Sequence, residues 1–176
     1  LTGKKLSEYS MATTTQLFDY ETMDWNQPLI QELGFNPDLF MPITPSGTNL
    51  GSIKEEITKE LGIDGFDVIS VTSHDTALAL QGLPMEEDYL FIATGTWVIV
   101  GAKQEKMTMN KKVMEYGLTN EGGSYPSVNL LKNHVGLWIL QESKRYWENN
   151  GMNIGFGEMV EVAREASINS IIDIYD

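Results

Sequence analysis

Residues 66–82 read FDVISVTSHDTALALQG. The apolar and β-branched residues of 66–71 predict a strand, and the pattern of 76–81 predicts a helical turn that follows it closely. A strand that leads directly into a helix is the arrangement in which α/β proteins place their ligands. His74 and Asp75 lie at this junction, so the first candidate site of the chain falls there.

Asp75 admits three interpretations at this position. An Asp at a helix start is most often a cap, whose carboxylate accepts hydrogen bonds from backbone N–H groups. A metal-binding pair with His74 is disfavoured, because such sites draw on several ligands and the chain has two histidines and no cysteine. As a general base, Asp75 would be kept ionised by the same N–H groups and by the helix dipole, and would accept a proton from a hydroxyl. The pattern leaves the cap and the base open.

Two short helices are expected before this strand. The first begins at Asn26, with proline near its first position, and Gly34 ends it. The second has the capping-box pattern Ser52-Ile53-Lys54-Glu55, an apolar residue at every fourth position, and Gly62 as a left-handed stop. Between the two helices, 36–51 is expected to form a loop because it is rich in proline and glycine.

Two apolar runs, 89–93 and 97–100, flank the polar segment Thr94-Gly95-Thr96. This pattern predicts two paired strands that are joined by a tight turn. Successive small residues in such a turn can direct their N–H groups at an anion, and the threonine hydroxyls can donate further hydrogen bonds. An ordinary hairpin turn has the same composition, so the turn alone does not identify a site.

A long helix is expected over 127–149, because its apolar residues recur at helical spacing. Asn133 and Gln141 interrupt the apolar face of this helix and would lie about 12 Å apart along its axis. Two amides at this separation could bind opposite ends of one elongated ligand, or could be exposed polar residues beside a core stripe. A last helix is expected from about 158 to 166, and the apolar stretch 171–174 follows it.

The composition is that of a folded protein with a core, since 41% of the 176 residues are hydrophobic and 21% are charged. The formal net charge of −13 argues against nucleic acid or an anionic membrane surface as a partner. The absence of cysteine excludes thiol catalysis and thiolate metal sites, and fits a cytoplasmic location. No apolar run approaches the roughly 20 residues that span a bilayer, and no signal peptide is apparent.

These segments, in this order, resemble the FGGY family of carbohydrate kinases, and most closely its rhamnulokinase-like branch, which includes fuculokinases. The segment SHDTA (73–77) is similar to the catalytic segment of the family, and TGTW (94–97) is similar to its phosphate-binding turn. The segments TNEGG (119–123) and LKNHVGLWILQ (131–141) resemble the start of the helical part of its second domain. Each motif alone is weak, but the set in this order is specific.

The resemblance implies an α/β fold of the actin-like, ribonuclease-H-like type, in which two domains close on a cleft that holds the sugar and, beyond it, ATP. Asp75 would be the general base that takes the proton of the sugar hydroxyl, and His74 and Thr76 would lie beside it at the substrate. The other residues carried over are Asn133 near the sugar and Gly95, Thr96 and Gln141 at the nucleotide. Mg²⁺ would be bound by the phosphate oxygens, so no residue is assigned to a metal.

Two departures from the family pattern are visible. The phosphate-binding turn of the family often contains serines where this chain has Ala93, Thr94 and Val98. Family members are also considerably longer, and neither their N-terminal phosphate hairpin nor their C-terminal adenine segment has a counterpart here. The chain is therefore expected to be a central piece, with 1–83 as the C-terminal part of the first domain and 84–176 as the N-terminal part of the second.

The leading hypothesis is an ATP-dependent kinase of a ketose such as rhamnulose or fuculose, active only in its intact form. The alternative is a non-catalytic module of the same fold that binds sugar or nucleotide, because fold and motif do not guarantee turnover. A purely structural or oligomerisation fragment is the least favoured hypothesis. Neither the identity of the sugar nor the oligomeric state follows from the sequence.

Overall fold

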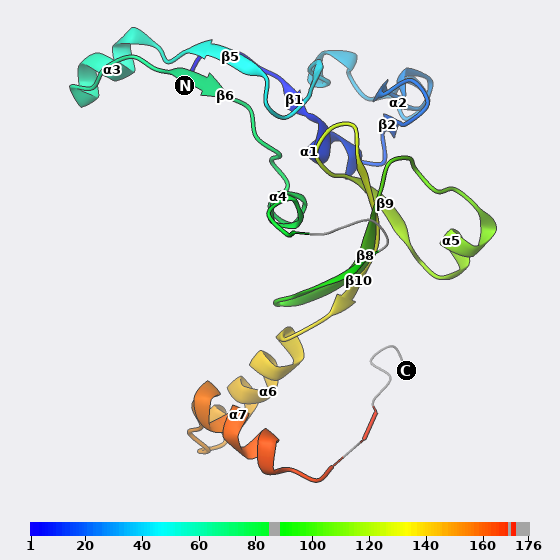
Figure 1. The fold of residues 1–176 in the computed structure, drawn as a ribbon, viewed down its shortest axis with the longest axis vertical. Helices are drawn as coiled ribbons and strands as arrows, with labels where there is room; N and C mark the ends of the chain where they lie inside the picture. Colours follow the sequence, from blue (N-terminus) through cyan, green and yellow to red (C-terminus); the bar gives the residue numbers. More distant parts are fainter. Residues whose placement is uncertain (85–88, 169, 172–176) are drawn as a thin grey trace. The chain divides into compact units, whose positions relative to one another are not determined.

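The computed structural model describes residues 1–84, 89–168 and 170–171. It divides into two compact units, the first made of residues 1–91 and 101–132 and the second of residues 92–100 and those from Asn133 onward (Figure 1). The predicted boundary between 83 and 84 is not tested by this division and stays a prediction. Most of the predicted apolar stretch 171–174 lies outside the described residues.

The first unit consists of short elements. In chain order they are β1 (Ser7–Glu8), α1 (Tyr9–Thr13), β2 (Phe18–Asp19), β3 (Asp24–Trp25), α2 (Gln27–Glu32), the 3₁₀ helix η1 (Pro37–Leu39), β4 (Ile43–Thr44), β5 (Asn49–Ser52), α3 (Glu55–Leu61), β6 (Asp67–Ile69), α4 (Asp75–Gln81), α5 (Lys111–Glu115) and β9 (Thr119–Gly122). The longer strands β7 (Leu90–Thr94), β8 (Trp97–Gln104) and β10 (Val128–Val135) contribute residues to both units. The second unit also contains α6 (Trp138–Asn149) and α7 (Phe156–Glu165).

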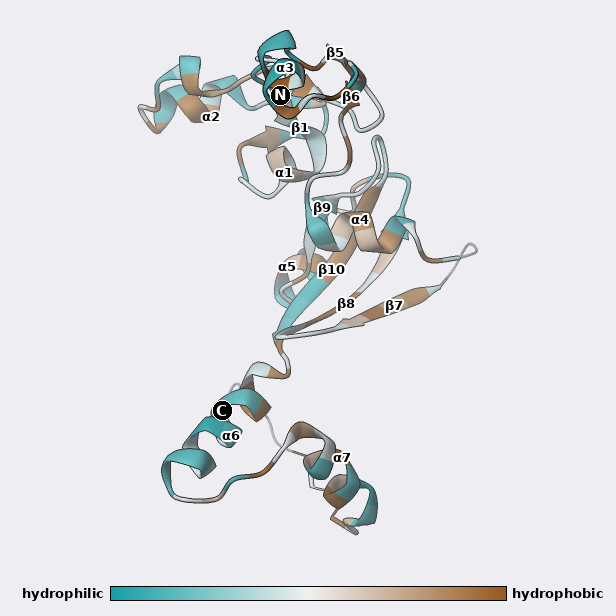
Figure 2. Cartoon of the chain, turned by 90° about the vertical axis from the view of Figure 1, so that its left-hand side faces the viewer, coloured by the Kyte–Doolittle hydropathy of each residue, from teal (hydrophilic) through white to brown (hydrophobic). Residues whose placement is uncertain are grey.

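Strand pairing joins segments that are distant in the sequence. β1 pairs with β4 in parallel, with Ser7 opposite Ile43, whereas β2 with β3 and β5 with β6 pair in antiparallel fashion. The largest sheet has the strand order β7-β8-β10-β9, and its last two strands are antiparallel. Apolar residues follow one another along β7 and β8 in Figure 2.

The core of the first unit is an aromatic cluster around α1. Its buried members are Tyr9, Ala12, Phe18, Trp25 and Ile30. The rings of Tyr9 and Phe18 meet edge to face with centroids 5.4 Å apart, a favourable arrangement for aromatic pairs. The Tyr9 hydroxyl also donates a hydrogen bond to the carbonyl of Ser127, at 3.3 Å. The same residue therefore contributes to the core and connects α1 to the segment before β10.

Several sequence-based predictions are confirmed in this unit. Asn26 caps α2 by accepting a hydrogen bond from the N–H of Leu29 at 3.1 Å, and Gly34 follows the helix with a positive φ of 71°. Gly62 ends α3 in the left-handed conformation with a φ of 65°. The predicted strand and helix around His74 are present as β6 and α4. Local capping and stop signals thus suffice for these elements.

The predicted capping box at residues 52–55 is wrong. α3 begins at Glu55, and its N-cap residue is Lys54, which makes no side-chain cap hydrogen bond. Ser52 lies instead in β5, where its hydroxyl donates to Asp67 Oδ1 at 2.8 Å. Because the Ser52 hydroxyl is bound to Asp67 across the β5–β6 pair, it does not cap the start of α3.

The predicted helix over 127–149 is also wrong in its first half. Residues 128–135 form β10, and a helix, α6, starts only at Trp138. β10 pairs along β9 from Val128 opposite Gly122 to Leu131 opposite Thr119. This pairing satisfies the backbone groups of the segment from outside it, so that tertiary context outweighs the helical spacing of its apolar residues.

The second unit ends with two helices, α6 and α7. The bounds of α7 are close to those of the last helix that the sequence predicts, about 158 to 166. Lys144 of α6 lies over the ring of Phe156 at the start of α7, 5.4 Å from its centroid, a cation–π contact. Met159 is the buried residue of α7. Within the described part of the chain, no helix has both the length and the apolar character required to cross a membrane.

Candidate functional site

The segment between β6 and α4 is fixed by buried hydroxyl groups. Ser70 is buried, and its hydroxyl donates to the carbonyl of Pro45 at 2.8 Å while it accepts from the N–H of Thr48 at 3.0 Å. The buried hydroxyl of Thr72 accepts a hydrogen bond from Gln81 Nε2 at 2.6 Å. Each of these bonds joins the segment to another part of the first unit, so its backbone path is defined up to His74.

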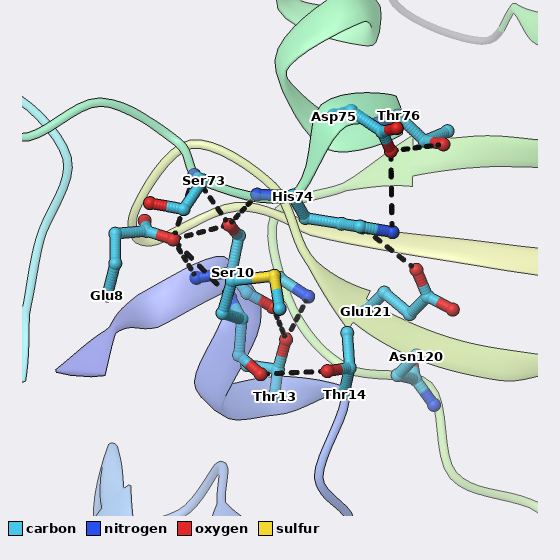
Figure 3. A network of polar contacts seen from close by, with 12 residues as sticks. Glu8, Ser10, Thr13, Thr14, Ser73, His74, Asp75, Thr76, Asn120 and Glu121 are labelled. Atoms are coloured by element: carbon cyan, nitrogen blue, oxygen red, sulfur yellow. Dashed lines mark hydrogen bonds and ion pairs between the residues drawn. The ribbon is translucent and has the colours of Figure 1, made fainter.

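Glu8 and Ser10 hold the next two residues of this segment from the side of α1 (Figure 3). The Oε2 atom of Glu8 accepts a hydrogen bond from the N–H of Ser73 at 3.1 Å. The hydroxyl oxygen of Ser10 accepts from the N–H of His74 at 3.0 Å. Both side chains are buried, so these are hydrogen bonds in an environment with little competing water.

His74 lies between two carboxylates. Its Nδ1 atom is 3.5 Å from Oε2 of Glu121, and its Nε2 atom is 3.9 Å from Oδ1 of Asp75. Glu121 belongs to β9, with a side chain that is 13% exposed, whereas the side chain of Asp75 is 97% exposed. The imidazole ring therefore connects a mostly buried carboxylate with one that is open to solvent.

Asp75 is the first helical residue of α4 and not its cap. The N-cap residue is His74, which makes no side-chain cap hydrogen bond. Asp75 Oδ1 accepts from the N–H of Thr76 at 2.6 Å and from the Thr76 hydroxyl at 3.3 Å. The interpretation of Asp75 as the N-cap residue is therefore wrong, and its exposed carboxylate is accessible to a hydroxyl of a ligand.

β9 is fixed on both sides of Glu121. The side chain of Asn120 accepts a hydrogen bond from the N–H of Thr108 and donates one to the carbonyl of Thr108, both at 3.0 Å. The N–H of Gly122 donates to the hydroxyl of Thr13 in α1 at 2.7 Å. Because its two neighbours are held in this way, Glu121 has a defined backbone position beneath His74.

Two tyrosines, the buried Tyr9 and the partly buried Tyr20, lie behind this part of the site. Burial raises the pKa of Tyr20 to about 12, and the nearby carboxylate of Glu121 also raises it. The Tyr20 hydroxyl donates to the carbonyl of Asn120 at 3.0 Å. Burial likewise raises the pKa of Tyr9 above its ordinary value. Both tyrosines therefore stay neutral at physiological pH.

The segment Thr94-Gly95-Thr96, in the second unit, forms the predicted connection between β7 and β8. The N–H of Gly95 donates to the carbonyl of Trp97 at 2.8 Å, so it is used within the turn and is not free to bind an anion. The carbonyl groups of Gly95 and Thr96 accept from the N–H groups of Leu137 and Gly136, at 2.9 and 3.1 Å. The turn is thus bound to the start of α6, and a phosphate would rely on Thr96.

Thr96 lines a pocket of about 230 Å³ together with Trp97, Val135 and Trp138. The pocket is smaller than the several hundred Å³ of typical ligand sites, so it can hold only part of a ligand.

Asn133 and Gln141 both lie in the second unit, but on different elements. Asn133 is an exposed residue of β10, and Gln141 is an exposed residue of α6. The expected spacing of about 12 Å along one helix axis is therefore wrong, because the two residues do not share a helix.

The predicted site residues thus form two groups, one in each unit. His74, Asp75 and Thr76 are consecutive in the first unit, and the second unit contains Gly95, Thr96, Asn133 and Gln141. Sequence reasoning missed Glu8, Ser10 and Glu121, whose contacts reach across many residues. The only signal was that Glu121 lies in the segment TNEGG, to which no role was assigned. Among the described residues, no group of three or more His, Asp or Glu side chains is arranged to hold a metal ion.

Comparison with known proteins assigns the first part of the chain to a family. The model of the N-terminal domain of the FGGY family of carbohydrate kinases matches residues 1–82. Residues 1–82 belong to the FGGY family. The segment that carries His74, Asp75 and Thr76 is inside this FGGY domain, whereas Glu121 and the phosphate-turn residues lie beyond it.

Curated relatives are similar to the chain over its whole length. The chain is 39% identical over 176 residues to a rhamnulokinase of Oceanobacillus iheyensis and 38% identical to one of Halalkalibacterium halodurans. All 176 residues are covered in both comparisons, but the chain spans only 37% of the length of each relative.

Solved structures show the same fold. A xylulose kinase from Lactobacillus acidophilus has a TM-score of 0.72 and 18% identity, with 94% of this chain and 33% of that chain covered. A gluconate kinase from the same organism has a TM-score of 0.73, with 18% identity and the same shares covered. These likenesses confirm the expected α/β fold of the actin-like type.

Proposed function

We propose that the intact protein to which this chain belongs is an ATP-dependent sugar kinase, which transfers the γ-phosphate to a hydroxyl of a ketose such as rhamnulose or fuculose. The observation that carries the proposal is the exposed carboxylate of Asp75 at a strand-to-helix junction within an FGGY domain. The identity to rhamnulokinases supports the class of sugar. We further propose a cytoplasmic location for the enzyme.

In this proposal Asp75 acts as the general base. Its carboxylate accepts hydrogen bonds from the N–H and the hydroxyl of Thr76, and it is open to take up a proton from the sugar hydroxyl. His74 and Thr76 flank it and would contact the sugar, with Asn133 as a further sugar ligand. Little other covalent chemistry is required, because phosphoryl transfer depends mainly on alignment and electrostatic stabilisation.

The ATP phosphates are assigned to the second unit. Thr96 offers its exposed side chain, Gly95 permits a close approach of the phosphate to the backbone, and Gln141 would contact the nucleotide. Hydrogen-bond donors of this kind can bind phosphate in a protein with a net charge of −13, because they act locally.

A divalent ion, proposed as Mg²⁺, fits the residues of this chain only as an ion carried by the nucleotide. Among the described residues, no group of three or more acidic or histidine side chains is arranged to hold a metal ion, and the exposed Asp75 is the carboxylate open to solvent at the site. Mg²⁺ is commonly held by one or two carboxylates together with phosphate oxygens and water. When bound, it would neutralise charge on the phosphates, while Asp75 remains the proton acceptor.

The test is sugar-dependent ADP formation by the intact protein with a panel of ketoses. We expect Asp75→Asn to lower kcat by at least roughly 100-fold, the lower range for loss of a general base, with little change in sugar affinity. Asp64→Asn is the matched control, because Asp64 is an exposed Asp outside the site. Normal turnover by the Asp75→Asn variant would show that Asp75 is not the base.

The isolated 176-residue chain is expected to be inactive, because it spans little more than a third of its relatives. Sugar-dependent ADP formation by the isolated chain would contradict this expectation. If the intact protein binds sugar or ATP without turnover, the proposal of a kinase is wrong and a binding module of the same fold is the better description.

A further inference from the structure

The imidazole of His74 lies between the carboxylates of Glu121 and Asp75 (Figure 3). Nδ1 is a buried atom that makes no hydrogen bond of ordinary length, and Oε2 of Glu121 lies 3.5 Å from it. Buried polar atoms are rarely left without a partner, so this nitrogen and the carboxylate oxygen form the natural donor and acceptor. Nε2, in contrast, faces the exposed carboxylate of Asp75.

α1 supports both members of this contact. Ser10 accepts a hydrogen bond from the N–H of His74, and Thr13, one turn later in α1, accepts one from the N–H of Gly122, next to Glu121. The backbones of His74 and Glu121 are therefore held by the same short helix. With both backbones fixed, the orientation of the imidazole ring depends on the contact between Nδ1 and the Glu121 carboxylate.

We propose that Glu121 is a positioning residue for sugar phosphorylation. Its carboxylate accepts a hydrogen bond from Nδ1–H of His74, fixes the tautomer and the orientation of the ring, and thereby directs Nε2 toward Asp75 and the sugar. This inference rests on the proposed function, because it assumes that sugar binds at Asp75. A carboxylate that orients a histidine through its second nitrogen is a general device of protein sites.

The separation of 3.9 Å between Nε2 and Asp75 Oδ1 is too long for a direct hydrogen bond, but it leaves the two atoms within reach of adjacent hydroxyls of one sugar. Because Nδ1 carries the proton, Nε2 can only accept: it would take a hydrogen bond from a neighbouring hydroxyl of the sugar while the reacting hydroxyl donates its proton to Asp75. Rotation of the ring away from Asp75 would remove this second contact. Glu121 thus acts on the reaction through His74 and does not touch the sugar.

The structural part of the proposal can be tested without enzymatic activity. The chain contains two histidines, so ¹⁵N-histidine NMR gives four ring nitrogen signals, two from each imidazole, and a His74→Gln variant assigns them. We expect a proton on Nδ1 of His74 in the wild type. Glu121→Met keeps the length of the side chain but removes the acceptor, and should shift the proton to Nε2. Glu105→Met, a change at an exposed glutamate, should leave the signal unchanged.

Glu121→Gln is the conservative variant, because its amide oxygen can still accept the Nδ1–H bond. It should retain the wild-type tautomer and rescue most of the activity that Glu121→Met loses. Backbone NMR spectra identify any variant that has failed to fold, and in that case the Gln variant is compared with Glu121→Ala. An unchanged His74 signal in a folded Met or Ala variant would overturn the proposal.

The kinetic part uses the intact kinase. Glu121→Met should lower kcat for the preferred ketose by about 10- to 100-fold, the usual range for an outer residue that orients a site residue. KM for ATP should stay within a factor of about two. If wild-type protein shows the Nδ1 proton but no sugar-dependent turnover, the proposed function fails while the Glu121–His74 contact stands. A changed His74 tautomer with unchanged kcat would overturn the positioning role alone.

Discussion

At the scale of single residues, Glu8 connects two parts of the site that are distant in the sequence. Its carboxylate accepts from the N–H groups of Ser10 and Met11 as the cap of α1, and from the N–H of Ser73, 65 positions later in the chain. A single buried carboxylate thus joins the start of α1 to the segment that carries Asp75. The other oxygen, Oε1, is buried without a hydrogen bond to the described residues.

Glu8→Ala should destabilise the protein by about 1–3 kcal/mol, because buried N–H groups lose their acceptor. Urea unfolding measures this change, and Glu32→Ala provides the control, since Glu32 is an exposed residue of α2. We also expect Glu8→Ala to lower the activity of the intact enzyme, because Ser73 and His74 would be less well fixed. Equal unfolding free energies for the Glu8 and Glu32 variants would contradict the assigned role.

The sequence reveals the chemistry of the candidate site but not its support. Asp75 and His74 stand at a strand-to-helix junction that can be recognised from hydropathy and from motif. Glu8 and Glu121 become partners of this segment only when the chain folds, since they are contributed by β1 and β9. Neither has a local pattern that distinguishes it from the other acidic residues of an acidic chain.

At the scale of elements, the segment 128–135 shows where sequence reasoning is limited. The buried residues of this segment are Val128, Asn129 and Leu131. Their spacing fits a helix, and it fits equally well a strand that is covered on both faces. A short apolar segment does not distinguish the two structures, and the partner strand decides between them. The ends of α2 and α3, by contrast, are specified locally by the left-handed glycines Gly34 and Gly62, which explains why both helices stop where expected.

The connection between β7 and β8 depends on a close approach of Gly136. A Cβ atom at this position would lie 2.7 Å from the carbonyl oxygen of Gly95 and 2.8 Å from a methyl group of Val98. Backbone atoms cannot move aside without displacing the turn that carries Thr96. The absence of a side chain at Gly136 therefore permits the hydrogen bonds between the turn and the start of α6.

Gly136→Ala should cost about 1–3 kcal/mol of stability, as overpacking usually does. In the intact enzyme it should also raise the KM for ATP, because the predicted phosphate turn is displaced. Gly157→Ala is the control, since a Cβ atom there meets nothing within 4 Å and the residue lies in α7. Unfolding curves and ATP titrations of the two variants test the assignment. Identical behaviour of the two variants would count against it.

At the scale of the whole molecule, the net charge of −13 makes stability sensitive to any additional negative charge. Tyr9 and Tyr20 of the first unit are a source of such charge at alkaline pH. The pKa of Tyr20 is raised from 10.0 to about 12, chiefly because burial disfavours the tyrosinate. Its contribution to stability is therefore complete below pH 10 and is lost as pH rises toward 12.

We expect the free energy of unfolding to fall between pH 10 and pH 12, and to fall less steeply in Tyr20→Phe. At neutral pH this variant should be slightly less stable than wild type, because it lacks the hydrogen bond to Asn120. Tyr116→Phe changes an exposed tyrosine and serves as the control. Urea unfolding at a series of pH values gives both comparisons. Parallel pH curves for wild type and Tyr20→Phe would refute the prediction.

The pocket beside Thr96 has an optical consequence. Trp97 and Trp138 line it and are more than half exposed, whereas Trp25 is buried in the aromatic cluster of the first unit. Indole fluorescence responds to changes in local polarity and to nearby quenching groups. A nucleotide bound at Thr96 would therefore alter the emission of two of the four tryptophans of the chain, so that occupancy could be followed without any attached label.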